Sequence, residues 1–438
     1  MGIKVVKFGG SSLADANMFR KVKDILLSDP SRAYVVPSAP GKRHAEDIKI
    51  TDLLYKCYTC VERKEAHEPV FELIAQRYLE IAEELHLSLN MRALLDETCA
   101  AIKENRSRDF AASRGEYLNG RMLADYLGWD FIDAADVVKF DRQGNFAAEW
   151  TNEVMRDVLR EHPRAVIPGF YGSYPNGEVH TFSRGGSDIS GAIVARAINA
   201  DIYENWTDVN GFLMADPRIV ANPRLIRRLT YHELRELSYM GANVMHEDAI
   251  FPVRKANIPT NIRNTNDPSQ PGTLITTHPA PDAYGASITG IAGHKNFTLI
   301  TLEKGMMNAE IGFGRRVLSA LEDFDIPFEH IPTGIDTMSI IIAEKELKQR
   351  KEQLISRLND AVHPDSIDFS PSLALIATVG QQMISRPGTA ATLFTALADA
   401  NIPIRMIDQG ASELSIIVGV DVHDYEHALK AIYEAFVH

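Results

Sequence analysis

The sequence predicts an α/β domain with a mostly parallel β-sheet, followed by two smaller α+β modules. Buried β-branched runs alternate with segments of helical periodicity over about the first 280 residues, and this alternation is typical of a parallel sheet covered by helices. After that point the order strand, helix, strand, strand, helix occurs twice, as an internal repeat of about 75 residues. The change in character follows a Pro/Gly-rich stretch at 264–273, which indicates a domain exit.

The first element is a β-branched strand that ends in a lysine and a glycine pair, within the segment IKVVKFGGSS at 3–12. Paired glycines let backbone N–H groups approach an anion, and Lys7 adds a positive charge. Helical spacing follows at 18–27, so we expect the loop to open toward a helix N-terminus, where anions are favoured. A plain strand-to-helix turn explains the same residues, and the spacing of a Walker A loop is absent.

The middle of the first domain supplies the elements between the motifs. Helical periodicity runs from Thr51 to Asn105 with a break at Pro69. The remaining predicted elements are strands at 165–168 and 201–206 and helices at 189–198 and 231–239. Ligands of such sheets bind outside the carboxyl ends of the strands.

A second glycine cluster, TFSRGGSD at 181–188, opens the helix predicted at 189–198. Backbone amides from Gly185 onward suit one anion, and the planar Arg184 fork suits a carboxylate or phosphate. Asp188 is a candidate helix cap, a partner for a cation, or an acceptor for an ammonium group. Two glycine loops, one with a lysine and one with an arginine, favour phosphoryl transfer. A dinucleotide enzyme is disfavoured, because no G-x-G-x-x-G follows a strand.

Two further segments carry candidate residues. Glu116, in the SRGE segment, is a candidate partner for a substrate ammonium group or a solvated helical glutamate. The loop at 206–218 follows a strand and contains turn residues, so it offers a place for a nucleotide base and ribose.

The internal repeat predicts the elements of the two C-terminal modules. The first copy comprises a strand at 297–303, a helix at 310–324, strands at 326–332 and 337–343, and a helix at 344–358. The second copy comprises a strand at 373–379, a helix at 389–398, strands at 402–408 and 413–420, and a helix at 424–436.

Composition restricts the partners and the compartment. The net charge of −13 disfavours nucleic acid and anionic membranes as partners. No apolar run approaches ~18 residues, and the chain starts directly with a strand, so we expect no spanning helix, no signal peptide and a cytoplasmic location. Cys57 and Cys60 lie one helical turn apart without a second pair, which predicts reduced thiols in place of a redox or zinc site.

These motifs resemble those of the aspartate kinases, in the amino acid kinase family. The segment at 7–12 is similar to K-F-G-G-[ST]-S, that at 113–116 to S-x-G-E, and that at 182–188 to G-R-G-G-S-D with Ser183 in place of the first glycine. The segment at 207–218 is similar to T-D-V-x-G-x-Y-T-x-D-P-R, and the repeat resembles paired ACT modules. The resemblance covers essentially the whole chain.

The resemblance implies a fold and a domain organisation. The expected fold is a three-layer amino acid kinase sandwich of the carbamate kinase type, with two ferredoxin-like ACT domains. The expected domains are a kinase domain at 1–285 and ACT domains at 286–368 and 369–438. Because one ACT module is interrupted by the other in related enzymes, the segment at 287–291 is expected to belong with the second module. The chain ends about where that module ends, so we expect no fused homoserine dehydrogenase.

The implied reaction is transfer of a phosphoryl group from ATP to the side chain of L-aspartate, which gives 4-phospho-L-aspartate and ADP with Mg²⁺ as the cofactor. This is the entry step to lysine, threonine, methionine and diaminopimelate synthesis. The reacting carboxylate has an ordinary pKa of about 3.9 and is already an anionic nucleophile, so no general base is required. The absence of a Ser-His-Asp constellation agrees with this chemistry.

The resemblance also assigns roles to individual residues. Lys7 is expected to neutralise the transferring phosphoryl group, and Asp188 to orient Lys7 or to help fix the aspartate. The expected phosphate and nucleotide residues are Lys7, Phe8, Gly9, Gly10, Ser11, Ser38, Thr207, Asp208, Leu213, Asp216, Arg218 and Asn243. The expected aspartate-binding residues are Thr51, Glu116, Arg184, Gly185, Ser187 and Asp188. No residues are assigned as a fixed metal site.

Paired ACT modules imply feedback control and a homodimer or a larger homo-oligomer. An amino-acid effector, lysine or threonine or both, is expected to bind there and to favour an inactive state. The expected effector residues are Met306, Asn308, Ile311, Gly312, Phe313, Asp336 and Thr337.

Two alternative functions stay open. Another amino acid kinase, acting on glutamate, N-acetylglutamate or UMP, would share the kinase domain, although such relatives generally lack two ACT modules. A catalytically weakened amino-acid sensor is the second alternative, because the chain departs from the family pattern. Leu213 replaces a tyrosine, Asn243 replaces a phosphate-facing lysine, and Glu247 replaces a proline.

We predict that Asn243→Lys tightens ATP binding, because it restores the lysine that the family pattern places toward the phosphates. The KM for ATP should fall while the KM for the acceptor stays constant. An unchanged KM for ATP would contradict this assignment.

Overall fold

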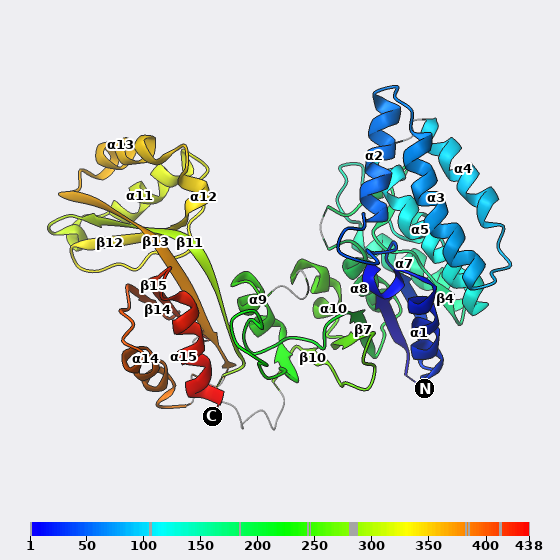
Figure 1. The fold of residues 1–438 in the computed structure, drawn as a ribbon. Helices are drawn as coiled ribbons and strands as arrows, with labels where there is room; N and C mark the ends of the chain where they lie inside the picture. The colour runs from blue at the N-terminus through cyan, green and yellow to red at the C-terminus, as the bar shows by residue number, and fades with distance from the viewer. Residues whose placement is uncertain are drawn as a thin grey trace. The chain divides into compact units, whose positions relative to one another are not determined.

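The computed structural model describes residues 2–104, 107–183, 185–242, 245, 247–279, 288–381, 383, 386–410 and 414–437 (Figure 1). The chain divides into two compact units. Unit 1 comprises Met1–Phe212, Arg227–Leu234 and Asn243–Pro279, and unit 2 comprises Leu213–Ile226, Arg235–Ala242 and Ala280–His438. Across the described residues, no helix has both the length and the apolar character needed to cross a bilayer.

Unit 1 is built on an eight-stranded sheet with the order β3-β4-β2-β1-β7-β9-β10-β8. Its strands are β1 Lys4–Phe8, β2 Arg32–Pro37, β3 Asp130–Phe131, β4 Ala165–Val166, β7 Ile202–Thr207, β8 Arg228–Thr230, β9 Thr260–Asn264 and β10 Thr273–Thr276. All neighbours from β3 to β9 are parallel, and only β10 pairs antiparallel with β9. The predicted mostly parallel sheet is therefore confirmed.

The helices of this part of the chain are α1 Ala16–Leu27, α2 Ile50–Glu62, α3 Glu68–Glu84, α4 Met91–Lys103, α5 Arg108–Leu127, α6 Ala134–Val137, α7 Ala148–Arg160, α8 Gly186–Ala197, α9 Tyr231–Tyr239 and α10 Phe251–Lys255. This part of the chain also contains two 3-10 turns, η1 Gly10–Leu13 and η2 Glu247–Ile250, and a hairpin of β5 Tyr171–Ser173 with β6 Val179–Thr181.

Two local predictions for unit 1 need correction. The helical stretch at 51–105 is three helices, and Pro69 lies in the first turn of α3, where a missing N–H is tolerated, so it starts a helix. The glycine pair leads into η1 and not directly into α1, whose N-terminus is capped by the Asp15 carboxylate through the Met18 amide at 2.9 Å.

Alternation along the central strands divides their side chains between two helical layers. Val6, Phe8 and Trp206 belong to a hydrophobic core shared with α1 to α5, which Figure 1 shows grouped together. Lys7 and Asn205 occupy the intervening positions and point to the opposite face, on which α8 packs against β1, β2 and β7. The result is a three-layer α/β/α arrangement, with Lys7 between the sheet and α8.

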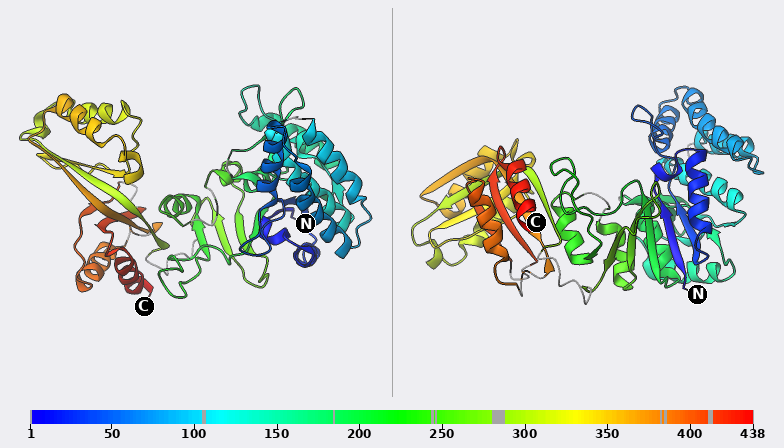
Figure 2. Two further views of the ribbon diagram at one scale, coloured as in Figure 1. Left: turned by 45° about the horizontal axis from the view of Figure 1, so that its top comes forward. Right: turned by 60° about the horizontal axis from the view of Figure 1, so that its bottom comes forward.

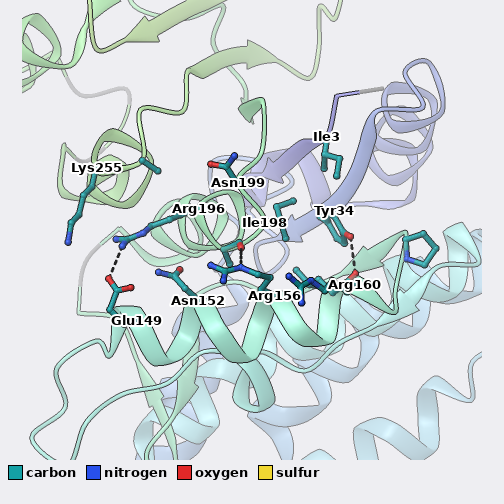
Figure 3. Close-up of a pocket in the computed structure, with 14 residues that line it drawn as sticks. Ile3, Tyr34, Glu149, Asn152, Arg156, Arg160, Arg196, Ile198, Asn199 and Lys255 are labelled. Carbon is teal, nitrogen blue, oxygen red and sulfur yellow. Dashed lines mark hydrogen bonds and ion pairs between the residues drawn. The ribbon is translucent and has the colours of Figure 1, made fainter.

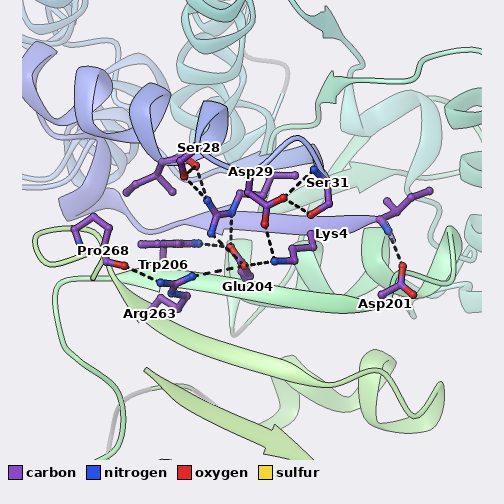
Figure 4. A network of polar contacts seen from close by, with 12 residues as sticks. Lys4, Ser28, Asp29, Ser31, Asp201, Glu204, Trp206, Arg263 and Pro268 are labelled. Atoms are coloured by element: carbon purple, nitrogen blue, oxygen red, sulfur yellow. Dashed lines mark hydrogen bonds and ion pairs between the residues drawn. The ribbon is translucent and has the colours of Figure 1, made fainter. Parts of the chain in front are cut away.

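A buried charge network ties the central strands together (Figure 4). Glu204 on β7 is 1% exposed and accepts hydrogen bonds from Arg32 on β2, at 2.8 Å from Nε and 3.3 Å from Nη2. The Trp206 indole N–H donates to the same carboxylate at 2.8 Å. Lys4 and Arg263 contribute positive charge at 3.4 Å and 3.9 Å from Glu204. This carboxylate therefore connects β1, β2, β7 and β9.

Unit 2 contains a five-stranded antiparallel sheet with the order β12-β11-β13-β15-β14. Its strands are β11 Gly290–Glu303, β12 Thr337–Ala343, β13 Ser366–Val379, β14 Met406–Asp408 and β15 Ser415–Asp421. Its helical elements are η4 Met307–Ala309, α11 Phe313–Glu322, α12 Glu344–Leu347, α13 Lys351–Val362, α14 Thr389–Asp399 and α15 Tyr425–Val437.

The two repeats interlock through the long strands β11 and β13, which run side by side (Figure 2). Residues 297–303 of β11 pair with β12 and form one core with α11 and α13. Residues 290–293 of β11 pair instead with the second half of β13, beside α14 and α15. The start of β11 therefore completes the second module, while the boundaries at 286, 368 and 369 stay a prediction.

Three predicted elements of unit 2 differ from the structure. The strand at 326–332 is reduced to an isolated bridge between His330 and Ile341, and that at 402–408 to β14. Both segments contain prolines, which remove ladder donors. The helix at 344–358 is split into α12 and α13, with the Arg350 side chain bonded to the Phe324 carbonyl oxygen at 2.6 Å.

We predict that Glu204→Ala lowers the free energy of unfolding by about 3–5 kcal/mol, because it leaves the buried Arg32 without its carboxylate. Asp157→Ala, which breaks an exposed pair with Arg160, should cost less than about 1 kcal/mol. Urea unfolding of the two variants measures the difference. Equal losses would contradict a stabilising role for the network.

Candidate active site

The candidate site lies at the carboxyl ends of β1 and β2, where two glycine-containing turns are in close contact. The Gly41 amide donates to the Gly10 carbonyl oxygen at 2.8 Å. A Cβ atom on Gly41 would lie 2.5 Å from the Gly10 carbonyl carbon, and one on Gly10 would lie 2.9 Å from the Ala39 oxygen. These two glycines are therefore required by backbone packing. A Cβ on Gly9 would lie 3.6 Å from Lys7 Nζ and from the Trp206 carbonyl oxygen, which are ordinary van der Waals distances, so packing alone does not require glycine there.

Lys7 forms a buried polar group with Asp188 and Asn205. Its Nζ lies 2.6 Å from Asp188 Oδ1 and 3.4 Å from Asn205 Oδ1. The Asn205 amide donates to the same Asp188 oxygen at 2.8 Å. Lys7 and Asn205 are 7% and 4% exposed, so these interactions are only weakly screened by solvent. The ammonium group is thereby fixed beside the glycine turn.

Helix α8 brings Asp188 to this position from its first turn. A Cβ on Gly191 would lie 2.6 Å from the Tyr203 ring, so glycine lets α8 approach β7 closely. The Tyr203 hydroxyl also donates to the Asp188 carbonyl oxygen at 3.0 Å. Gly185, at φ +70°, forms the left-handed N-cap of the helix. Arg184 lies outside the described residues.

A second part of the candidate site is a buried carboxylate, Glu116, on α5. Glu116 is 6% exposed, and burial raises its pKa from the ordinary 4.5 to about 8, although the Ala39 amide partly opposes the shift. Its Oε2 atom has no hydrogen-bond partner among the described residues. Asn119, one turn later, donates to the Ser38 carbonyl oxygen at 2.6 Å but leaves its own Oδ1 unpaired. Two unsatisfied buried acceptors on one helix face call for a donor from a ligand.

The other residues predicted for unit 1 occupy the loops and helix ends around these groups. Ser38 follows β2 and donates its amide to the Phe8 carbonyl oxygen at 3.1 Å. The Phe8 side chain is fully buried, so only its backbone is available to a ligand. Thr51 lies in the first turn of α2, Ser11 is exposed in η1, and Ser187 is buried in α8. Thr207 ends β7 and donates to Asp208 at 3.1 Å.

Three predicted nucleotide residues belong to unit 2. Asp216 accepts from the Arg218 amide at 2.9 Å and pairs with its guanidinium at 2.6 Å, and these hydrogen bonds lower the pKa of Asp216. Leu213 is half-buried and forms a bridge with Leu225. The structure brings Lys7, Gly9 and Asp188 together, whereas Asn243, like Arg184, lies outside the described residues.

The predicted effector residues surround one loop of unit 2. The Met306 amide donates to Asp336 Oδ1 at 2.8 Å, and the Asn308 amide donates to the Ile335 carbonyl oxygen at 3.1 Å. Thr337 begins β12 and Gly312 caps α11 at φ +83°, while Phe313 is buried. Met306 and Ile311 are 74% and 96% exposed, so the loop presents apolar side chains to solvent.

Sequence reasoning missed Gly41, Asn119 and Asn205. The signal for Asn205 was a polar pair inside the apolar strand IYENWT, and that for Asn119 was its position one helical turn after Glu116. Neither signal names a partner, because the partners come from distant strands and loops.

Comparisons with known proteins agree with this geometry. Residues 2–264 match the model of the amino acid kinase family, and residues 376–436 match an ACT domain. Aspartokinase 3 of Bacillus subtilis is 38% identical over 99% of this chain and 98% of its own length. The crystal structure of Clostridium acetobutylicum aspartate kinase aligns with this chain over the full length of both proteins, with 52% identity and a TM-score of 0.93.

More distant relatives extend the comparison. Escherichia coli aspartokinase III is 25% identical over the full length of both chains, with TM-scores of 0.74 for its complex with aspartate and ADP in the R-state and 0.75 for its complex with lysine and aspartate in the T-state. The chain spans about half the length of the bifunctional aspartokinase/homoserine dehydrogenase of Daucus carota, at 31% identity.

The three-layer sandwich, the lysine beside a glycine turn and the family match define a phosphotransferase of the α/β class. The chain belongs to the amino acid kinase family, and within it to the aspartate kinases. The predicted fold class, including the C-terminal ACT region, is thereby confirmed.

We predict that the free energy of unfolding falls as the pH rises from about 4.5 to about 8, because the folded chain holds the Glu116 proton more tightly than the unfolded chain does. Glu116→Gln removes this contribution, so the two stability curves should differ most across this interval. Glu83→Gln, on an exposed position of α3, is the control and should retain the wild-type slope. Parallel curves for wild type and Glu116→Gln would contradict the raised pKa.

Proposed function

We propose that this aspartate kinase transfers the γ-phosphoryl group of ATP to the side-chain carboxylate of L-aspartate, giving 4-phospho-L-aspartate. The observation that carries the proposal is the buried Lys7–Asp188–Asn205 group beside the glycine turn at the end of β1. Escherichia coli aspartokinase III, with a similar fold, has been crystallised with aspartate and ADP. The acyl phosphate product begins the synthesis of lysine, threonine, methionine and diaminopimelate.

The chemistry requires positioning and charge neutralisation. The aspartate carboxylate is anionic at neutral pH and attacks without a general base, so the main obstacle is its repulsion by the γ-phosphate. Lys7 supplies a positive charge, and the amides of Gly9 and Gly10 supply donors for the phosphate oxygens. Asp188 and Asn205 hold Lys7 in one orientation before the substrates bind.

The buried oxygens of Glu116 and Asn119 on α5 favour a substrate with a free amino group. We assign Glu116 and Asn119 Oδ1 as acceptors for the substrate ammonium group, because both oxygens are buried and unpaired. Arg184 is assigned to the α-carboxylate, with Thr51, Gly185 and Ser187 completing the aspartate site. N-acetylglutamate has no ammonium group and would leave Glu116 unsatisfied, which disfavours it as the substrate.

Nucleotide binding in unit 1 is assigned to the turn at 8–11, Ser38, Thr207, Asp208 and Asn243, while the nucleotide roles of Leu213, Asp216 and Arg218 in unit 2 stay a prediction from the resemblance. Mg²⁺ in kinases is bound through substrate phosphates with one or two carboxylates, and we assign this role to Asp188 in the first turn of α8 and Asp208 directly after β7. When bound, Mg²⁺ neutralises phosphate charge. The described residues hold no cluster of three His, Cys, Asp or Glu, so no separate metal centre is assigned.

Regulation is assigned to the ACT region of unit 2. We propose that lysine or threonine binds at the Met306–Phe313 loop opposite Asp336, in a homodimer formed by the edges of this sheet. The exposed apolar side chains of Met306, Ile311 and Ile335 support an interface there. Escherichia coli aspartokinase III has been crystallised with lysine in its T-state.

The three free cysteines fit a reducing cytoplasm.

We predict that hydroxylamine trapping detects an acyl phosphate with ATP, Mg²⁺ and aspartate, and not with glutamate or N-acetylglutamate. Lys7→Ala and Asp188→Asn should lower kcat by about 100-fold or more, because both disturb the charge that meets the phosphoryl group. Lys103→Ala, at an exposed position of α4, is the matched control and should leave kcat unchanged. Product from glutamate but not from aspartate would overturn the proposal. Addition of lysine, threonine or both to this assay identifies the effector.

A further inference from the structure

Unit 1 contains a cavity of about 840 Å³ at the amino ends of β1 and β2, opposite the candidate active site (Figure 3). Helix α7 forms one wall, and Ala197 and Ile198 at the end of α8 form another. Ile3 directly precedes β1, and Tyr34 lies on β2, so both belong to the centre of the sheet. The volume lies within the range of small-molecule sites, about 300–1,000 Å³. Nothing in the proposed phosphoryl transfer uses this cavity.

The cavity is lined by four cations and a single carboxylate. The cations are Arg156, Arg160, Arg196 and Lys255, and the carboxylate is Glu149. Glu149 pairs with Arg196 at 2.9 Å and Asp157 pairs with Arg160 at 3.4 Å, so the local surplus of positive charge, on a chain with a net charge of −13, comes from Arg156 and Lys255. Within the described parts of the chain, no carboxylate lies within ion-pair distance of Arg156 or Lys255.

Helix termini explain only part of this charge. Helices α7, α8 and α10 all end near the cavity, and cations are favoured at helix C-termini. Arg156 acts in this way through Nε, which donates to the Ala197 carbonyl oxygen at 3.3 Å. Its terminal nitrogens have no partner among the described residues, so the planar fork remains available to a ligand (Figure 3).

The inner wall combines apolar surface with one unpaired amide. Tyr34 and Leu159 are buried, and the Tyr34 hydroxyl donates a hydrogen bond to the Leu159 carbonyl oxygen at 3.1 Å. Asn152 on α7 is only 5% exposed and lines the cavity, and its amide has no hydrogen-bond partner in the described parts of the chain. Its amide atoms are not among the fully enclosed unsatisfied polar atoms, so the side chain faces the cavity, where it hydrogen-bonds to water or to a polar group of a ligand.

We propose that this cavity binds a small organic anion, whose carboxylate or phosphate group meets the Arg156 fork and whose apolar body packs against Tyr34 and Leu159, while Lys255, on the far side of the Arg196–Glu149 pair, adds positive charge at the rim (Figure 3). The unpaired cations favour a ligand with an anionic group, and the apolar inner wall favours a ligand with an apolar body. Asn152 supplies a hydrogen bond to a polar atom between the two. Such a ligand does not occupy the proposed substrate site, because the cavity and Lys7 lie at opposite ends of β1.

The test uses the full chain and four probes: phenyl phosphate, benzoate, inorganic phosphate and benzyl alcohol. Calorimetric titration and saturation-transfer NMR measure binding to wild type, to Lys7→Ala and to the double variant Arg156→Gln/Lys255→Gln. Lys103→Gln/Arg142→Gln removes the same charge from exposed positions elsewhere and is the matched control. Phosphotransferase activity of the cavity and control variants verifies that unit 1 is folded.

Phenyl phosphate, benzoate or both should bind to wild type and to Lys7→Ala, with the stronger probe identifying the preferred head group. The cavity double variant should weaken that binding by about tenfold or more, whereas the control should stay within about twofold. Absence of binding by both aromatic anions, or equal binding by the cavity variant, would overturn the proposal. Equal affinity for inorganic phosphate would indicate an adventitious ion only, and equal affinity for benzyl alcohol would exclude selection of charge.

Discussion

The buried ion pair between Lys7 and Asp188 is the constraint on which the catalytic end of unit 1 depends. A lysine taken out of water is costly unless a carboxylate and further hydrogen bonds compensate it. Here the compensation comes from the first turn of α8 and from Asn205 on the neighbouring strand. The pair therefore forms only when β1 lies beside β7 in the correct register and α8 lies closely on both. A shift of one residue along β7 would turn Asn205 to the opposite face.

The rest of the architecture maintains that register. Glu204, the residue before Asn205, points to the other side of the sheet and joins four strands through its contacts with Arg32, Lys4 and Arg263. Gly191 allows the close approach of α8 to β7. One face of the central strands thus carries the charge network that stabilises their order, and the other face carries the Lys7–Asp188 pair, for which we propose contact with the phosphate. Helix α8 extends from this site toward the cavity at the opposite end of the strands.

The organisation of unit 2 shows which structural features local sequence patterns can predict and which they cannot. The repeat and most of its elements were predicted correctly, and β12 has the predicted bounds 337–343. The resemblance led to the expectation that the segment at 287–291 belongs with the second module, but the pattern of the repeat did not show that β11 and β13 are continuous strands shared by both modules. Hydrophobic alternation describes a single strand and the face that it buries, but it does not identify the neighbouring strand. The short β14 reflects prolines that were visible in the sequence and were given too little weight.

The order of the motifs led to the prediction of Lys7, the glycine turns and Glu116 as site residues, because the chemistry assigned to them depends on residue type and on local backbone form. Asn205, Asn119 and the close contact at Gly41 were decided only by the tertiary structure. Each acquires its role from a partner far along the chain, and Asn205 lies 198 residues from Lys7. The raised pKa of Glu116 belongs to the same class, since desolvation by the surrounding helices causes it. Burial and strand pairing are collective properties of the folded chain, and no local segment contains them.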